Sequence, residues 1–185
     1  GAAVFTAVTT TDGAVDLEAT GGNLTVGTAV TAGGSNNASL TTTTSGNVVL
    51  TGTTTAADDQ VTVTSAGNIN GAGLVTGSTI DLNAGSGIGN TTQLELSGST
   101  ITADTILGDI DVDSAVAATF TTVTTGTGSI VVDADAATSF TTVTTTDGTV
   151  DLEVIVGNLT VGTAVTAGGS NNALLTTTTS GNVVL

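Results

Sequence analysis

Apolar and polar residues alternate in short runs along the whole chain. Examples are VDL at 15–17, IDL at 80–82 and IDV at 110–112. A period of two residues is typical of a β-strand with one buried face, and no segment keeps a 3.6-residue period over the length of a helix. Glycine, often followed by asparagine, precedes many of these runs, as expected for turns between strands. The pattern therefore predicts an all-β chain of many short strands.

The glycines in these turns recur at a nearly constant interval. Sequence numbers rise by 24, 21, 22, 19, 20 and 20 along the series Gly22, Gly46, Gly67, Gly89, Gly108, Gly128 and Gly148. The next glycine that we align with the series is Gly181, which follows Gly148 after a clearly longer interval. We assign the excess to one longer coil that carries the polar loop Thr31–Asn37 and its counterpart Thr166–Asn172.

A 20-residue displacement places like residues in register. It superimposes three sets of apolar positions: Ile110, Ile130 and Val150; Val112, Val132 and Leu152; Phe120 and Phe140. Stacked coils should place such residues in inward columns, with coils separated by about 4.8 Å. We therefore predict an all-β fold, a parallel β-helix (β-solenoid) with coils of about 20 residues. A chain of small β-sandwiches is the alternative, and we disfavour it because sandwich cores need larger residues than this chain contains.

A longer repeat overlies the coil. Residues 5–50 return at 140–185 with 40 of 46 positions identical and a constant 135-residue offset. Fixed self-similarity of this kind indicates a repeat architecture. We expect one continuous β-solenoid segment over residues 1–185, with a tandem repeat at 5–139 and a partial copy at 140–185, cut from a longer array. Each repeat should hold six coils, or seven shorter ones if GNLTV begins a coil of its own.

Composition supports an ordered chain with an unusual surface. Threonine supplies 45 of the 185 residues, 38% of residues are hydrophobic, and the mean hydropathy is +0.42. Disordered chains are low in hydrophobicity and poor in β-branched residues. There is no Lys, Arg, His, Cys, Met, Trp, Tyr or Pro, so the 16 acidic residues leave a net charge of −16.

The absence of cations rules out several classes of function. Nucleic acid binding depends on Lys and Arg to neutralise phosphates, and attraction to anionic membranes depends on them too. No apolar run reaches the roughly 18 residues of a membrane helix, so we expect no membrane insertion. Without His, Cys, Lys, Arg or Tyr, the usual bases and activated nucleophiles are missing, and we expect no enzymatic activity.

One acidic cluster is the candidate metal site. Three aspartates alternate with Ile110 and Val112, which is expected to place the three carboxylates on one face. Two further carboxylates align with the last of them at the 20-residue displacement, so the full set is Asp109, Asp111, Asp113, Asp133 and Glu153. Such a ladder of carboxylates either repels itself as a solvated acidic face or binds Ca²⁺ or Mg²⁺ through oxygen ligands. It is no EF-hand, because Ser114 and Phe120 stand where Gly and Glu are required. We expect no required cofactor, with Ca²⁺ as the candidate ligand.

Threonine pairs form a second candidate surface. The pairs Thr122/Thr124 and Thr142/Thr144 stack at the 20-residue displacement. Flat threonine arrays on β-solenoids resemble the ice-binding face of some antifreeze proteins. The simpler interpretation is that exposed threonine is a good strand former.

Several segments together resemble a known family. The sequences GNLTVGTAVTAGG (22–34), SAGNINGAG (65–73), LNAGSGIGN (82–90) and GDIDVDS (108–114) resemble the β-helical shafts of filamentous-haemagglutinin-like proteins, giant secreted bacterial surface adhesins. The resemblance implies a structural shaft of a long repetitive filament, an extracellular or cell-surface location, and self-association with identical repeats or parallel chains. The alternative function is a repeated ligand-binding face on the same solenoid, for divalent cations, glycan or ice.

Overall fold

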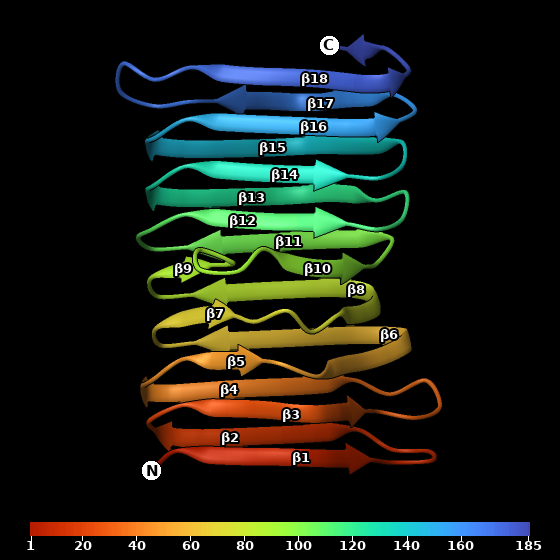
Figure 1. Ribbon diagram of the computed structural model, residues 1–185, viewed down its shortest axis with the longest axis vertical. Coiled ribbons are helices and arrows are strands. Elements are labelled where there is room, and N and C mark those ends of the chain that lie inside the picture. Colours follow the sequence, from red (N-terminus) through yellow and green to blue (C-terminus); the bar gives the residue numbers. More distant parts are fainter.

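The computed structural model describes all residues from Gly1 to Leu185 and contains only β-strands and their connections. Its strands form about nine coils, about 21 residues apart, that stack along one axis. Figure 1 shows the resulting rod, with the N-terminus at one end and the C-terminus at the other. The predicted parallel β-solenoid is therefore confirmed.

The strands fall into two stacks, one on each broad side of the rod. The first stack contains β1 (Ala3–Thr9), β3 (Leu24–Thr31), β5 (Val48–Leu50), β7 (Asn68–Asn70), β9 (Gly87–Ile88), β10 (Leu94–Ser97), β12 (Ile110–Ser114), β14 (Ile130–Ala134), β16 (Val150–Val156) and β18 (Ala173–Ser180). The second stack contains β2 (Val15–Gly21), β4 (Ala38–Ser45), β6 (Thr53–Ser65), β8 (Val75–Ala84), β11 (Thr100–Thr105), β13 (Thr119–Thr127), β15 (Thr138–Asp147), β17 (Leu159–Thr166) and β19 (Val183–Val184). The first residues of β6 and β8 bend round the edge and pair with strands of the first stack.

Each strand pairs in parallel with the strand one coil further along the chain. The columns predicted from the 20-residue displacement are all present: Ile110 pairs with Ile130 and Ile130 with Val150; Val112 pairs with Val132 and Val132 with Leu152; Phe120 pairs with Phe140. Period-two alternation makes these pairings possible, because it keeps every apolar position on the inner side when the strands are in register.

The core is a single cluster of 38 buried apolar residues that runs between the two stacks. Aliphatic side chains dominate it. The rings of Phe120 and Phe140 stack with their centroids 5.3 Å apart and their planes 19° from parallel. Phe5 occupies the position equivalent to Phe140 in the first copy but is only half-buried, because β1 has no coil on its outer side. Burial at a given sequence position thus depends on having a coil on both sides.

Buried hydroxyl groups close one corner of several coils. Thr125 donates its hydroxyl proton to the carbonyl of Gly108 at 2.8 Å, and Thr145 donates to the carbonyl of Gly128 at 2.8 Å. Gly128 has φ +138°, and a Cβ there would lie 2.4 Å from the carbonyl carbon of Gly108, so only glycine fits this turn. These bonds give the glycine carbonyl groups side-chain donors at the corner, and Thr105 also donates to the Gly108 carbonyl at 3.2 Å.

The strand registers correct the predicted coil count of the 135-residue repeat. Val15 pairs with Ala38 in the second stack, whereas its copy Val150 pairs with Ala173 in the first stack. The repeat therefore contains about six and a half coils, not six or seven. The error arose because Gly181 was aligned with Gly148. Gly148 precedes a strand of the first stack and packs on Gly128, whereas Gly181 precedes a strand of the second stack and packs on Gly157, so the two glycines lie at opposite edges. The interval between them is about one and a half coils, not one long coil.

The predicted polar loop is present in both copies, between β3 and β4 and between β17 and β18. In the first copy the Asn36 side-chain amide donates to Asp12 Oδ1 at 3.0 Å and to the Gly33 carbonyl at 2.8 Å. In the second copy Asn171 makes the same two bonds, to Asp147 and Gly168, at 3.0 and 2.8 Å. We call this arrangement the clasped loop. Figure 1 shows the two clasped loops protruding from opposite edges of the rod.

Candidate functional site

Four of the five acidic residues of the candidate site lie on the outer side of the first stack, and Asp109 does not. Four carboxylates form one column on adjacent strands, one from each of β10, β12, β14 and β16: Glu95, Asp113, Asp133 and Glu153. Neighbouring members are about 4.8 Å apart along the axis, as paired strands require. The predicted alignment of Asp113 with Asp133 and Glu153 is confirmed. Glu95 was missed because the coil that joins it to Asp113 is shorter than the 20-residue displacement used to find the column.

A second column beside the first is interrupted. Asp111 pairs with Val131, and Val131 pairs with Asp151, so no carboxylate adjoins Asp111 in the next coil. A glutamine links the two columns. The Gln93 side-chain amide donates to Asp111 Oδ1 at 2.9 Å and to Asp133 Oδ2 at 2.8 Å. The chain has no cationic side chain, so the partial positive charge of this amide group is what lies between the two carboxylates. No sequence pattern identified Gln93.

Asp113 carries the largest electrostatic cost in the column. Its Oδ1 atom is buried and has no hydrogen-bond partner. Burial, followed by the nearby charges of Glu95, Asp135 and Asp133, raises the pKa of Asp113 to about 6. Burial also raises the pKa of Asp111 and of Asp151. Each of these carboxyl groups is therefore easier to protonate in the folded state than in the unfolded chain.

Asp109 does not share the face of the other residues. It is exposed and lies in the corner before β12, where its Oδ1 accepts a hydrogen bond from the backbone N–H of Ser129 at 2.7 Å. The expectation that Asp109, Asp111 and Asp113 would line one face is thus wrong for Asp109. The alternation ends at Ile110 because the chain turns there.

The five predicted metal ligands consequently occupy three different places. Asp113, Asp133 and Glu153 form the continuous column, Asp111 lies beside it, and Asp109 is in the corner. No group of three or more acidic side chains converges closely enough to enclose a metal ion. The arrangement is a linear array of carboxylates along the rod, which can attract cations along its length but forms no cage.

The outer side of the second stack carries the threonine columns. Thr122 pairs with Thr142 and Thr124 with Thr144, so the predicted stacking of these pairs is confirmed. In preceding coils, aspartates occupy the same columns: Asp81 pairs with Thr102, and Asp104 pairs with Thr124. Asp81 accepts a hydrogen bond from the Thr102 hydroxyl at 2.9 Å, and Asp104 accepts one from Thr124. Threonine hydroxyls on this face therefore stabilise neighbouring carboxylates.

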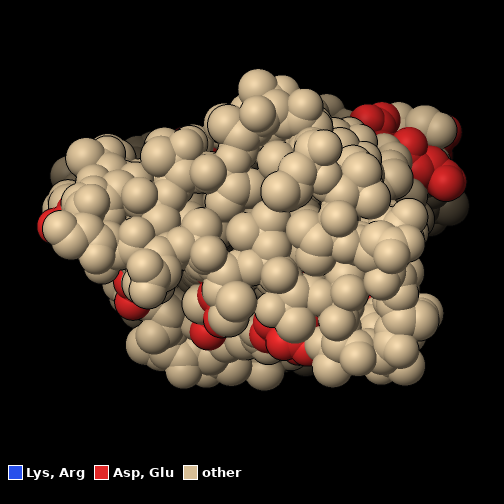
Figure 2. Space-filling model, turned by 90° about the horizontal axis from the view of Figure 1, so that it is seen from above, with Lys and Arg blue, Asp and Glu red and all other residues tan.

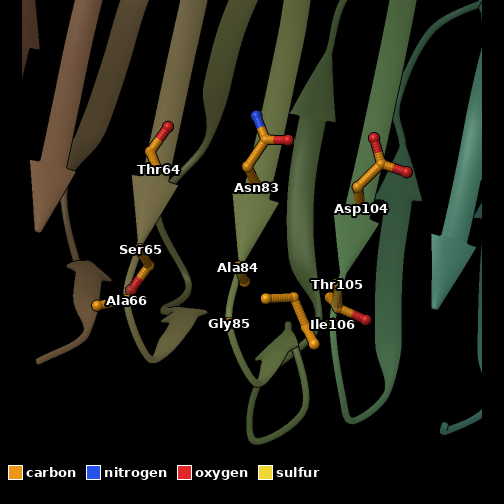
Figure 3. A pocket seen from close by; sticks show the side chains of 9 residues that line it. All are labelled: Thr64, Ser65, Ala66, Asn83, Ala84, Gly85, Asp104, Thr105 and Ile106. Carbon is orange, nitrogen blue, oxygen red and sulfur yellow. The ribbon is translucent and has the colours of Figure 1, made fainter. Parts of the chain in front are cut away.

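A shallow depression of about 360 Å³ lies at one edge of this face. Figure 3 shows the Thr64, Asn83 and Asp104 side chains projecting in parallel from β6, β8 and β11. The Ile106 side chain, 72% exposed, lines the same depression. A hydroxyl, an amide and a carboxylate in a row can hydrogen-bond a polar ligand, but they do not form a nucleophile with an activating base.

The acidic side chains form separate patches around the rod. Figure 2, which looks along the axis, shows several red patches on the lower side and another at one upper corner, with no blue atoms among them. Because the sequence has no Lys, Arg or His, no acidic side chain pairs with a cationic one, and only protons or dissolved cations can balance its charge.

The chain matches no family model, and no curated protein or solved structure is significantly similar to it. No helix long and apolar enough to cross a membrane is present.

We predict that the protein becomes more stable as the pH is lowered from 7.5 to 4.5. Because the pKa of Asp113 is raised to about 6 in the folded state, its contribution is present below the unfolded pKa near 4 and is lost as the pH rises through about 6. One pKa unit corresponds to about 1.4 kcal/mol, and partial exposure reduces the gain at this site to about 1 kcal/mol. Urea unfolding followed by circular dichroism measures it.

The control is Asp16→Asn, which removes one charge from an exposed side chain of the second stack. Asp113→Asn should raise stability at pH 7.5 and flatten the pH profile, whereas Asp16→Asn should leave the profile unchanged. A profile that Asp113→Asn does not alter would contradict the assignment.

We also predict that Gln93→Glu destabilises the protein by about 2 kcal/mol at pH 7.5, because it replaces a donor to two carboxylates with a third carboxylate. The loss should shrink at pH 4.5, where the new side chain is protonated and can donate again. Gln60→Glu adds the same charge at the only other glutamine and should cost less than half as much. Equal losses for the two variants would show that Gln93 has no bridging role.

Proposed function

We propose that this chain is a structural shaft segment of a long repetitive extracellular filament. The observation that carries the proposal is the junction between the two copies of the repeat. Phe120 on β13, in the first copy, pairs with Phe140 on β15, where the second copy begins, and both side chains are fully buried. The ladder and the core pass through the junction without interruption, so an added copy extends the same rod.

The physical basis of such a shaft is additive length and stability. Each coil packs on the coils before and after it, so stability grows with the number of coils, and each coil adds about 4.8 Å. The chain contains 116 backbone–backbone hydrogen bonds, and the strand pairing runs from the first strand to the last. The resemblance of its glycine- and threonine-rich segments to adhesin shafts supports the cell-surface or extracellular setting of the proposal.

The proposal predicts the size of a chain extended by one further 135-residue copy. Small-angle X-ray scattering should give a maximum dimension about 31 Å greater than that of the 185-residue chain, since six and a half coils are added at about 4.8 Å each. The cross-sectional radius should stay the same. A wider cross-section, or scattering from two flexibly linked bodies, would contradict a continuous shaft.

Weak binding of divalent cations along the acidic column is a second candidate function. The unpaired Oδ1 of Asp113 and the raised pKa of that carboxyl group favour it, because a cation would relieve the same repulsion that a proton relieves.

For this second candidate we predict that millimolar CaCl₂ at pH 7.5 raises the melting temperature by several degrees more than NaCl of equal ionic strength. Asp113→Asn should reduce the difference, and Asp16→Asn should preserve it. Equal effects of the two salts would mean that general screening alone acts on the acidic column.

A further inference from the structure

The two copies of the repeat have the same local structure on opposite sides of the rod. The pairing of Val15 with Ala38 returns as Val150 with Ala173, and the pairing of Leu24 with Val48 returns as Leu159 with Val183. In each case the first copy uses one stack and the second copy uses the other. The clasped loop returns with the same hydrogen bonds. The copies are therefore related by half a turn about the rod axis and a translation along it.

The size of the translation follows from the number of coils. Starting from Ala3, the pairings pass through Leu24, Val48, Ile69, Ile88 and Ile110 to Ile130, and the second copy then begins half a coil later. Six and a half coils at about 4.8 Å correspond to a rise of about 31 Å. A repeat with a whole number of coils would have returned every loop to the same edge.

We propose that tandem copies of this repeat form a rod with a two-fold screw axis, so that the clasped loop is a two-sided interaction surface. Successive loops alternate between the two edges about every 31 Å, and loops on one edge recur about every 62 Å. The partner that fits such a surface is a second rod of the same repeat lying parallel at the same height. The loops on its facing edge then fall midway between those of the first rod, and the protrusions do not collide.

The proposal stands on the strand registers and does not require the shaft function. The half-coil offset is the feature that permits this pairing. If all loops lay on one edge, one side of the rod would be smooth and the other side studded, and two parallel rods would have no equivalent faces to pair. With alternation, each rod presents the same surface to neighbours on both sides, which permits association to continue laterally.

The relation between the copies can be measured on the 185-residue chain by electron paramagnetic resonance. The chain has no cysteine, so two introduced cysteines take nitroxide labels without competition. Three exposed loop positions suit the purpose: Ser35, Ala137 and Ser170. Ser35 and Ala137 lie on one edge, each just before a strand of the second stack. Ser170 lies before a strand of the first stack.

For Ala137→Cys/Ser170→Cys we expect a distance of about 30 Å, the width of the rod spanned by about ten extended residues. The control pair, Ser35→Cys/Ala137→Cys, is separated by five coils along one edge and should give about 24 Å. If the clasped loop that contains Ser170 lay on the same edge as Ala137, the two labels would be only one or two coils apart. The spectrum would then show strong dipolar broadening from labels within about 10 Å. That result would overturn the two-fold screw and with it the two-sided surface.

Lateral pairing is measured separately on a chain extended by two further 135-residue copies. Electron micrographs of it should show ribbons of parallel rods in register. Deletion of residues 34–36 with all their copies, which keeps the buried Ala32 and the Asn37 carbonyl that pairs with Val15, should abolish them. Dispersed rods, or ribbons that persist without the loops, would overturn the assignment of the second rod as partner.

Discussion

Parallel stacking of each strand on the strand one coil earlier is the interaction on which the structure depends. It satisfies the backbone donors and acceptors of the inner coils, and it forces identical depths of burial at equivalent positions. The columns from Ile110 to Val150 and from Val112 to Leu152 are apolar for this reason. The corner threonines and glycines follow from the same constraint. Successive coils are only about 4.8 Å apart, so a turn must fit closely against the next coil and its carbonyl groups need hydrogen-bond donors there. Phe5 and Phe140 show the consequence: the same residue is half-buried or fully buried according to whether a coil lies on its outer side.

The lack of any cation shapes the surface as strongly as stacking shapes the core. Carboxylates on this chain accept hydrogen bonds from hydroxyl, amide and backbone donors in place of ion pairs. Gln93 bridges Asp111 and Asp133, Thr102 donates to Asp81, and the backbone of Ser129 donates to Asp109. Asp113 is the place where this compensation is incomplete. Because strands of successive coils pair in register, an acid that recurs at the same position of each coil generates a column of like charge.

Much of the fold could be predicted because its period is visible in the sequence. Alternation of apolar and polar residues identified the strands, and a 20-residue displacement identified the inward columns of β12, β14 and β16. The half-coil offset between the copies could not be found in this way. Glycines mark turns at both edges of the rod and look the same in sequence, so the step from Gly148 to Gly181 was interpreted as one long coil. The acidic column was predicted only where that displacement holds, which excluded Glu95. Gln93 acts through a contact across coils of unequal length, and Asp109 lies beyond the end of its strand.

Cross-hydrogen-bond scalar couplings in the NMR spectrum of the perdeuterated chain test the stacking most directly. The backbone N–H of Ile110 donates to the carbonyl of Ser129 at 2.9 Å, and that of Ile130 donates to Thr149 at 2.9 Å. Couplings are expected from the amide nitrogens of Ile110 and Ile130 to the carbonyl carbons of Ser129 and Thr149, each about one coil further along the chain. Couplings from these amides to residues within the same or an adjacent hairpin would contradict a parallel solenoid.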